Sequence, residues 1–331
     1  MKKRDSVLVL LGILFISFNL RAPITAVGSV VGLIKAEYGL SNAVAGFITT
    51  LPLLAFALVS PFVAGTSAKL GQARTMMAGL LFILAGEFIR SYTGAVGLFA
   101  GTLVIGIGIA IGNVLIPAII KKNFAGKVGA VTSVYTSGMC IYAAVGAGIS
   151  VPLASGLGFG WKNALASWFI LTLITMLIWL PQVAKKDDGK AQVRAKSKNS
   201  IWKEPLAWWV TLFMGIQSLI FYALVAWLPT IITSKGLSDG FAGNMALLFQ
   251  LMAIPATLLI PTLSDRFSNQ KGLSVAVCAV YAVGQIVFLI GSSAPVMVLA
   301  VVLLAIGMGG SISLSIAFDC MVWWFGCLVV W

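Results

Sequence analysis

Long apolar runs separated by short polar segments extend along the whole chain. Ten runs are long enough to cross a membrane as helices, because the hydrocarbon layer takes about 20 helical residues. They lie at residues 7–34, 43–66, 74–92, 96–120, 128–154, 163–183, 206–233, 241–263, 272–291 and 295–318. The pattern predicts an all-α membrane protein with about ten transmembrane helices.

The composition supports this prediction and argues against other classes. Of the 331 residues, 60% are hydrophobic and 9% are charged, whereas a soluble domain is about 25% charged. The net charge of +13 lies in short loops and not in a basic, aromatic-rich patch, so no nucleic-acid partner is expected. Histidine is absent and the four cysteines show no CxxC spacing, so we expect no metal, disulfide framework or cofactor. Clustered acids or cysteines that would indicate a membrane enzyme are also missing from the sequence.

The distribution of basic residues predicts the orientation. Seventeen of the 22 lie in the N-terminus, in alternate loops and in the 184–204 linker, whereas four lie on the opposite side: Lys35, Arg90, Lys162 and Lys235. Basic loops stay in the cytoplasm. The N-terminus and the linker are therefore expected to be cytoplasmic, with the linker acting as a solvated connector near anionic headgroups.

Three matches in order suggest an internal repeat. GLSNAVAG at 39–46 recurs as GLSDGFAG at 236–243, SAKLG at 67–71 aligns with SDRFS at 264–268, and Gly106-x-Gly108 is matched by Gly307-x-Gly309. The offsets of 197 and 201 residues predict two parallel six-helix halves. The first half is expected at 1–183 and the second at 205–318. We expect the four glycines to be packing surfaces between helices.

This architecture resembles that of major facilitator transporters, whose two halves rock about a central site at the membrane midplane. The family's motif between the second and third spans, G-x-L-A-D-R-x-G-R, is partly kept in both halves. PTLSDRFSNQK retains Asp265 and Arg266, and AGTSAKLGQAR retains Lys69, Gly71 and Arg74. The resemblance implies that these residues form a cytoplasmic gating turn that latches neighbouring helices.

A closer resemblance covers most of the chain up to Phe318. It rests on the blocks NLRAPITAVG (19–28), TTLPLLAFALVSP (49–61), GNVLIPAIIKKNF (112–124), FGW (159–161), WLPQ (179–182) and FYALVAWLPTII (221–232). Together they resemble the cyanate and 2-nitroimidazole transporter subfamily. The resemblance implies a monomeric secondary transporter in the cytoplasmic membrane of a bacterium, working by alternating access. ATP drive is not expected, since the sequence has no GxxxxGK[ST] loop.

Arg21 is the only charged residue among the 28 of the first apolar run. It would lie roughly 20 Å from either end of that helix, near the bilayer midplane. A guanidinium binds planar anions through two parallel hydrogen bonds, so a small anion such as cyanate, a carboxylate or a polarised nitro-heterocycle is a natural ligand. The alternative is that Arg21 donates to backbone carbonyls near Pro23 and braces a helix bend.

Other substrate-binding candidates are polar residues of the spans that line the pathway in this fold: Asn113, Tyr135, Gln217, Tyr222, Gln250 and Ser311. Each could instead form a hydrogen bond between helices. Glu87 is the one clear carboxylate within a span and a candidate for proton coupling. Arg90 lies three residues further on, on the same helix face, so we expect the two to pair.

The end of the chain departs from the pattern. Two repeats of 197 residues predict about 395 in all, and the tail 319–331 loses the resemblance. We expect a truncated or frame-shifted chain that lacks the last two helices, with a partial eleventh span as the alternative. A truncated, non-transporting paralogue or receptor-like protein is therefore the second functional hypothesis.

Overall fold

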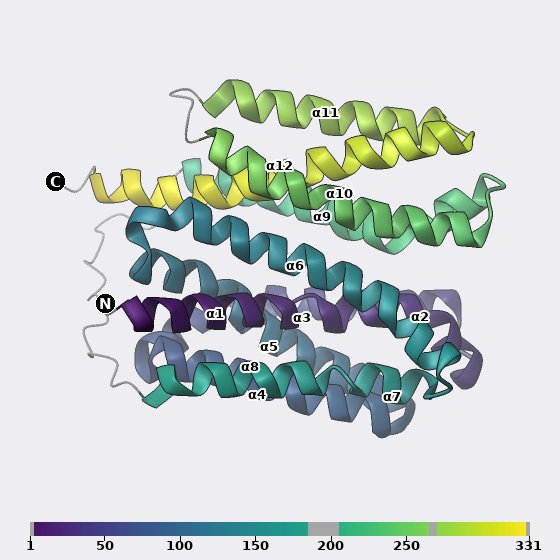
Figure 1. Ribbon diagram of the computed structural model, residues 1–331, viewed down its shortest axis with the longest axis horizontal. Coiled ribbons are helices and arrows are strands. Elements are labelled where there is room, and N and C mark those ends of the chain that lie inside the picture. Colours follow the sequence, from purple (N-terminus) through teal and green to yellow (C-terminus); the bar gives the residue numbers. More distant parts are fainter. Residues whose placement is uncertain (1–2, 185–204, 265–269, 329–331) are drawn as a thin grey trace. The chain divides into compact units, whose positions relative to one another are not determined.

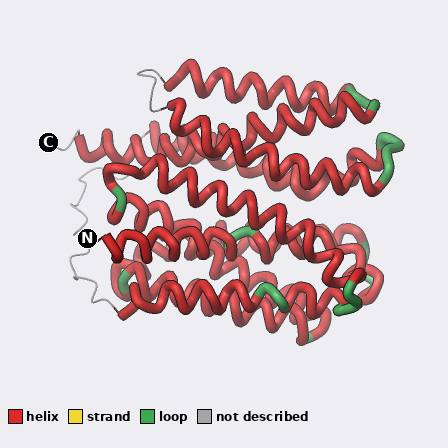
Figure 2. The backbone as a smooth tube through the Cα atoms, viewed as in Figure 1, coloured by secondary structure: helices red, strands yellow, loops and turns green. Residues whose placement is uncertain are grey.

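The computed structural model describes residues 3–184, 205–264 and 270–328, and within these ranges the chain is helical with short loops (Figure 2). The basic linker, Asp265 and Arg266 lie outside them. In chain order the elements up to residue 184 are α1 (Lys3–Asn19), α2 (Ala22–Tyr38), α3 (Asn42–Leu70), α4 (Gln72–Tyr92), α5 (Gly94–Asn123), the 3-10 turn η1 (Ala125–Lys127), α6 (Val128–Val151), the π-helical turn η2 (Pro152–Gly156), α7 (Gly160–Ala166) and α8 (Phe169–Ala184) (Figure 1). The remaining elements are α9 (Pro205–Ser234), α10 (Asp239–Ser264), α11 (Gln270–Ile290) and α12 (Ala294–Leu328).

The predicted spans are confirmed, and three of them are interrupted: the first between α1 and α2, the sixth between α7 and α8, and the seventh within α9. Nine stretches in the described part of the chain are long and apolar enough to cross a membrane, and α9 supplies a tenth if its two arms count as one. The arms, Thr211–Val225 and Trp227–Ser234, are bent by 54°. Pro229 explains the bend, since it has no N–H to donate to the carbonyl of Val225, four residues earlier.

Backbone contacts divide the chain into two compact units. Unit 1 comprises Met1–Val131 and Ile141–Val193, and unit 2 comprises Thr132–Cys140 and Arg194–Trp331. In unit 1, α4 and α3 pack against α5, and α8 packs against α1 and α4. In unit 2, α12 packs against α9, α10 and α11.

The repeated GLS sequences form equivalent turns in the two units. Gly39 and Gly236 have φ of 62° and 85°, a left-handed conformation that glycine adopts without a steric penalty. Two residues later, the hydroxyl of Ser41 accepts a hydrogen bond from the Val44 N–H, and that of Ser238 accepts one from the Phe241 N–H, each at 3.3 Å. The repeat therefore consists of a glycine turn followed by the serine cap of the next helix.

The paired glycines of α5 and α12 are packing surfaces, as predicted. A Cβ on Gly106 would lie 2.8 Å from the Cα of Pro52 in α3, and one on Gly108 would collide with α4 at Gly79. A Cβ on Gly307 would lie 2.7 Å from the Cα of Tyr281 in α11, and Gly309 faces α10. The 201-residue offset aligns Gly106 with Gly307, but the first packs on the second span of its half (α3) and the second on the third span of its half (α11), so their partners are exchanged. The two glycines of each pair have different partners because residues two positions apart lie on nearly opposite faces of a helix.

Lys235 follows the last residue of α9 and caps the C-terminus of α11. Its Nζ donates to the carbonyl oxygens of Phe288, Leu289 and Gly291 at 2.6, 2.9 and 2.6 Å. The ammonium thus uses all three of its donors on carbonyls that the helix end leaves open.

We expect Lys235→Met to destabilise unit 2 by about 1–3 kcal/mol, the range for hydrogen bonds to charged groups. Thermal unfolding in detergent measures this effect. Lys35→Met is the matched control, because the Lys35 Nζ contacts a single exposed amide, Asn42 Oδ1, at 2.5 Å. Equal melting temperatures for the two variants would contradict the capping role.

Candidate functional site

The first span breaks at the position of Arg21. Helix α1 ends at Asn19, and α2 begins at Ala22 and runs on from it (Figure 1). Pro23 accounts for the break, because its ring has no N–H for the carbonyl of Asn19 and clashes with it. Arg21 is the first residue outside α2, and its carbonyl accepts from the N–H groups of Ile24 and Thr25 at 3.1 Å each. The break places a cation between two half-helices near mid-span.

Neighbouring helices hold the residues on both sides of Arg21. A Cβ on Gly112 of α5 would lie 2.5 Å from the Leu20 side chain, and one on Gly146 of α6 would lie 3.0 Å from the Ala22 carbonyl oxygen. The Pro23 carbonyl oxygen accepts from Nη1 of Arg90 on α4 at 2.8 Å. The backbone around Arg21 is therefore fixed from three directions, while its own side chain is half-buried.

Asn113 lies at the level of this break, since it directly follows Gly112. Its side chain is half-buried, like that of Arg21. Four residues later, Pro117 has no N–H to donate to the Asn113 carbonyl, so the regular hydrogen-bond pattern of α5 is interrupted at this turn. Unit 1 thus places two of the predicted binding residues, one cationic and one an amide, at the same level of the helix bundle.

A buried polar cluster adjoins the break. Nδ2 of Asn19 donates to the Phe15 carbonyl oxygen at 2.9 Å and to Oγ1 of Thr175 at 2.7 Å. Its Oδ1 accepts from Oγ1 of Thr172 at 2.8 Å, and the same hydroxyl lies 3.1 Å from Oε2 of Glu87. Asn19 is 1% exposed and the two threonines and Glu87 are 0% exposed. The cluster ties the end of α1 to α8 and α4.

The expected pairing of Glu87 with Arg90 takes the form of an electrostatic interaction and not of a direct salt bridge. Both side chains are buried, but in the described part of the chain no salt bridge joins them. Arg90 instead binds the Pro23 carbonyl oxygen. Within the described residues, three polar atoms have no hydrogen-bond partner: Oε1 of Glu87, and Nε and Nη2 of Arg90. The spacing along α4 places Glu87 and Arg90 on one helix face. However, the Pro23 carbonyl oxygen on α2 binds Arg90, and the Thr172 hydroxyl on α8 binds Glu87. Arg90 thus braces the bend at Pro23, and the same role for Arg21, the alternative considered above, stays a prediction.

The polar candidates of unit 2 surround α12. Gln217 on α9 is buried, and its Nε2 lies 3.6 Å from Sδ of Met308. One turn along α12, the Ser311 hydroxyl donates to the Gly307 carbonyl oxygen of its own helix at 2.5 Å. Gln250 on α10 is buried as well. Gln217 of α9 thus lies beside the stretch of α12 that carries Ser311.

The two tyrosine candidates also lie in unit 2. The Tyr222 ring packs edge-on against Phe221, with centroids 5.1 Å apart. Tyr135 is buried in the part of α6 that is grouped with unit 2, and nearby Ser137 Oγ lies 3.4 Å from Thr257 Oγ1 of α10. Both tyrosines therefore have packing roles in addition to any contact with a solute.

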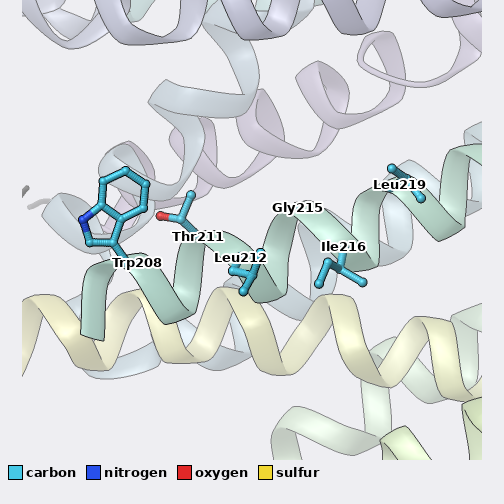
Figure 3. Close-up of a pocket in the computed structure, with 6 residues that line it drawn as sticks. All are labelled: Trp208, Thr211, Leu212, Gly215, Ile216 and Leu219. Atoms are coloured by element: carbon cyan, nitrogen blue, oxygen red, sulfur yellow. The ribbon is translucent and has the colours of Figure 1, made fainter. Parts of the chain in front are cut away.

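A shallow hollow of about 320 Å³ runs along one face of α9 (Figure 3). Its lining residues all belong to this helix: Trp208, Thr211, Leu212, Gly215, Ile216 and Leu219. Successive helical residues are about 100° apart, so Gln217 lies on the opposite, buried face. The lining has one hydroxyl and no charge, so this hollow is not a site for an anion.

The gating-motif residues of the first half lie at the turn between α3 and α4. Lys69 and Arg74 are exposed on either side of Gly71, whose φ is 89° and whose N–H donates to the Ser67 carbonyl oxygen at 2.9 Å. The glycine is needed for this left-handed turn. Asp265 and Arg266 lie outside the described residues.

The sequence interpretation missed several polar residues. Asn19, Thr172 and Thr175 were not singled out, although polar residues inside an apolar run were the available signal, and only the fold brings residues 153 positions apart together. Glu37 was missed too. It accepts from Nε1 of Trp161 at 2.5 Å and pairs with Nζ of Lys162 at 2.6 Å, which explains part of the FGW block.

Comparison with known proteins identifies the family. The Major Facilitator Superfamily matches residues 9–322. The chain belongs to the Major Facilitator Superfamily. The crystal structure of a D-xylose–proton symporter has the same fold, with a TM-score of 0.62 over 95% of this chain and 86% of that chain at 14% identity.

Individual relatives within the superfamily show the resemblance to the cyanate and 2-nitroimidazole transporter subfamily. The "Uncharacterized transporter YycB" of Bacillus subtilis (strain 168) is 44% identical over 95% of this chain and 78% of its own. The 2-nitroimidazole transporter of Escherichia coli (strain K12) is 40% identical over 86% of this chain and 72% of its own, and the cyanate transport protein CynX of the same organism is 24% identical over 81% and 70%. These findings confirm membership of the cyanate and 2-nitroimidazole transporter subfamily. The chain is accordingly a multi-pass membrane protein related to transporters of small solutes.

Proposed function

We propose that this major facilitator protein is a secondary transporter of a small anionic or polar solute, working by alternating access. The observation that carries the proposal is the break in the first span, where a half-buried arginine lies between two half-helices whose backbone is held by three neighbours. A charge at this depth costs about 2.5–3.5 kcal/mol or more, so an arginine kept there has a functional or structural purpose. Arg90 already donates to the Pro23 carbonyl oxygen, and we propose that the purpose of Arg21 is the functional one.

The solute class follows from the chemistry of the donors. Arg21 offers five N–H groups in a fixed fork, which suits a carboxylate, a linear anion such as cyanate or a nitro group. Asn113 would add an amide donor and acceptor. The names of the relatives, a 2-nitroimidazole transporter and a cyanate transport protein, are consistent with this class. Tyr135, Gln217, Tyr222, Gln250 and Ser311 are proposed as further contacts.

The remaining features of the proposal come from the sequence pattern. The two halves at 1–183 and 205–318 would move against each other, with the N-terminus in the cytoplasm and Lys69, Gly71, Arg74, Asp265 and Arg266 forming cytoplasmic gates. The protein would act as a monomer in the bacterial cytoplasmic membrane. Glu87 is proposed as the coupling group for a proton gradient.

Uptake by proteoliposomes containing the purified protein tests the proposal. We expect accumulation of radiolabelled 2-nitroimidazole or cyanate above that of protein-free liposomes, with competition between the two solutes and no requirement for ATP. A folded protein that neither transports these solutes nor is stabilised by them would overturn the proposal. It would instead support a non-transporting membrane paralogue.

A further inference from the structure

The hydrogens of the polar cluster beside the break can be counted from its geometry. Nδ2 of Asn19 lies 2.9 Å from the carbonyl oxygen of Phe15, which only accepts, so this end of the amide must be the NH₂ group. Its two hydrogens are then used by Phe15 and by Oγ1 of Thr175, at 2.7 Å. The Thr175 hydroxyl in turn donates to the Leu171 carbonyl oxygen at 2.8 Å. Among the described residues, Oδ1 of Asn19 is thus left as an acceptor with one neighbouring donor, Thr172.

Thr172 has one hydroxyl hydrogen and two acceptors in reach. Its Oγ1 lies 2.8 Å from Oδ1 of Asn19 and 3.1 Å from Oε2 of Glu87. When the hydrogen points to Asn19, the contact with Glu87 is a hydrogen bond only if the carboxyl group itself carries a proton. When Glu87 is ionised, the hydroxyl has to turn to the carboxylate, and Oδ1 of Asn19 loses its donor. No single orientation of the Thr172 hydroxyl satisfies both the protonated and the ionised state of Glu87.

We propose that Glu87, Thr172 and Asn19 form a hydrogen-bond relay that couples the protonation of Glu87 to the break in the first span. In the protonated state Glu87 donates to Thr172, Thr172 donates to Asn19, and the last residue of α1 is held. In the ionised state Thr172 donates to Glu87 and the Oδ1 of Asn19 is released, two residues before Arg21. A buried acceptor without a donor is costly, so this release loosens the end of α1. The proposal rests on the transport function, and makes Thr172 and Asn19 positioning residues.

The charged groups around Glu87 leave it as the titrating member of this relay. Arg90, one turn further along α4, is buried and fixed to the Pro23 carbonyl. The facing helix α8 contains no ionisable residue, and the lysines of α5 lie in its last turn. Arg21 lies at the break itself, Lys162 on α7 is paired with Glu37, and Lys69 is at the exposed end of α3. The relay requires that the proton on the buried Glu87 is exchanged with water during the transport cycle.

Transport under an imposed pH gradient, with radiolabelled 2-nitroimidazole as the solute, tests the relay. Glu87→Gln places a permanent NH₂ donor opposite Thr172 and mimics the protonated state. This variant is expected to exchange solute at close to the normal rate, while gradient-driven accumulation falls by about tenfold, a typical size for coupling between two sites. Thr172→Val should uncouple transport to a similar degree, and Thr172→Ser should restore it.

The matched control is Thr102→Val. Thr102 is also buried, but its hydroxyl donates to the Leu98 carbonyl oxygen of its own helix at 2.6 Å. We expect normal accumulation by this variant. Normal coupling in Thr172→Val, or equal losses in Thr102→Val and Thr172→Val, would overturn the relay.

Infrared difference spectra between pH steps provide a readout that does not depend on the solute. The relay predicts a C=O stretching band of a protonated carboxyl group that is absent in Glu87→Gln, shifted in Thr172→Val and unchanged in Thr102→Val. If this pattern is found in a protein that transports neither test solute, the relay stands and the proposed function fails. If uptake occurs but the band is the same in all variants, the relay fails and the proposed function stands.

Discussion

Arg21→Gln is expected to weaken solute binding and uptake strongly while leaving the protein folded. A hydrogen bond to a charged group contributes about 1.5–3 kcal/mol, so the Kd of the solute should rise by about 10- to 100-fold. The effect on stability should be small or favourable, because the substitution removes a charge from the middle of a span. Equilibrium binding of radiolabelled 2-nitroimidazole and of cyanate to protein in lipid nanodiscs measures the first quantity, and thermal unfolding measures the second.

Two further variants make this experiment decisive. Arg21→Lys keeps the charge but loses the planar fork, so it should recover only a small part of the affinity if the contact is bidentate. Lys35→Gln removes a cation from the far end of the same span, where its Nζ contacts the exposed Asn42 side chain, and should bind normally. If Arg21→Gln instead melts at a much lower temperature and binds normally, Arg21 stabilises the bend and does not bind the solute.

Gly101→Val is expected to have the largest effect on folding. Any Cβ at this position in α5 would collide with the backbone of Arg90, and it would lie 2.6 Å from the Gly86 carbonyl oxygen. These are backbone atoms of α4 and cannot rotate away, so α4 and α5 would have to separate. Overpacking costs about 1–3 kcal/mol and occasionally more, and for valine at this contact we expect about 3 kcal/mol. At about 2 °C per kcal/mol for a chain of this size, the melting temperature should fall by about 6 °C.

Gly65→Val is the matched control for this substitution. Gly65 lies in α3 and a Cβ there would have no neighbour within 4 Å. Both substitutions change a helical glycine to the same β-branched residue, so intrinsic helix propensity cancels in the comparison. Equal melting temperatures for the two variants would show that close packing of α4 on α5 is not required.

The membrane fold could be predicted from the sequence because it depends on local composition. A hydrocarbon layer requires about 20 apolar residues in each helix, so each span can be recognised from its own apolar stretch of sequence. The packing glycines could be predicted for a related reason, since close helix contacts in a membrane require small residues at the interface. Their partners could not, because the helix against which each glycine packs depends on how the helices are arranged.

The candidate site was predicted only in part. Arg21 was recognised because a charge in an apolar run is conspicuous, and Glu87 for the same reason. Their partners were not recognised, because a hydroxyl such as Thr172 is a common residue in a membrane helix and becomes significant only when Asn19 and Glu87 are both in reach. The hydrogen bonds that replace a direct salt bridge between Glu87 and Arg90 were not predicted, because spacing along one helix says nothing about competing groups on other helices.

By itself, the sequence determined the membrane class, the approximate number and position of the spans, and the family, because these depend on the composition and order of short segments. Only the tertiary structure decided which carbonyl Arg90 binds, that Glu87 shares a hydroxyl with Asn19, and that Gly101 receives the backbone of α4. The physical reason is that hydrogen bonds and van der Waals contacts act over a few ångströms, and residues far apart in the chain come within that range only when the helices pack.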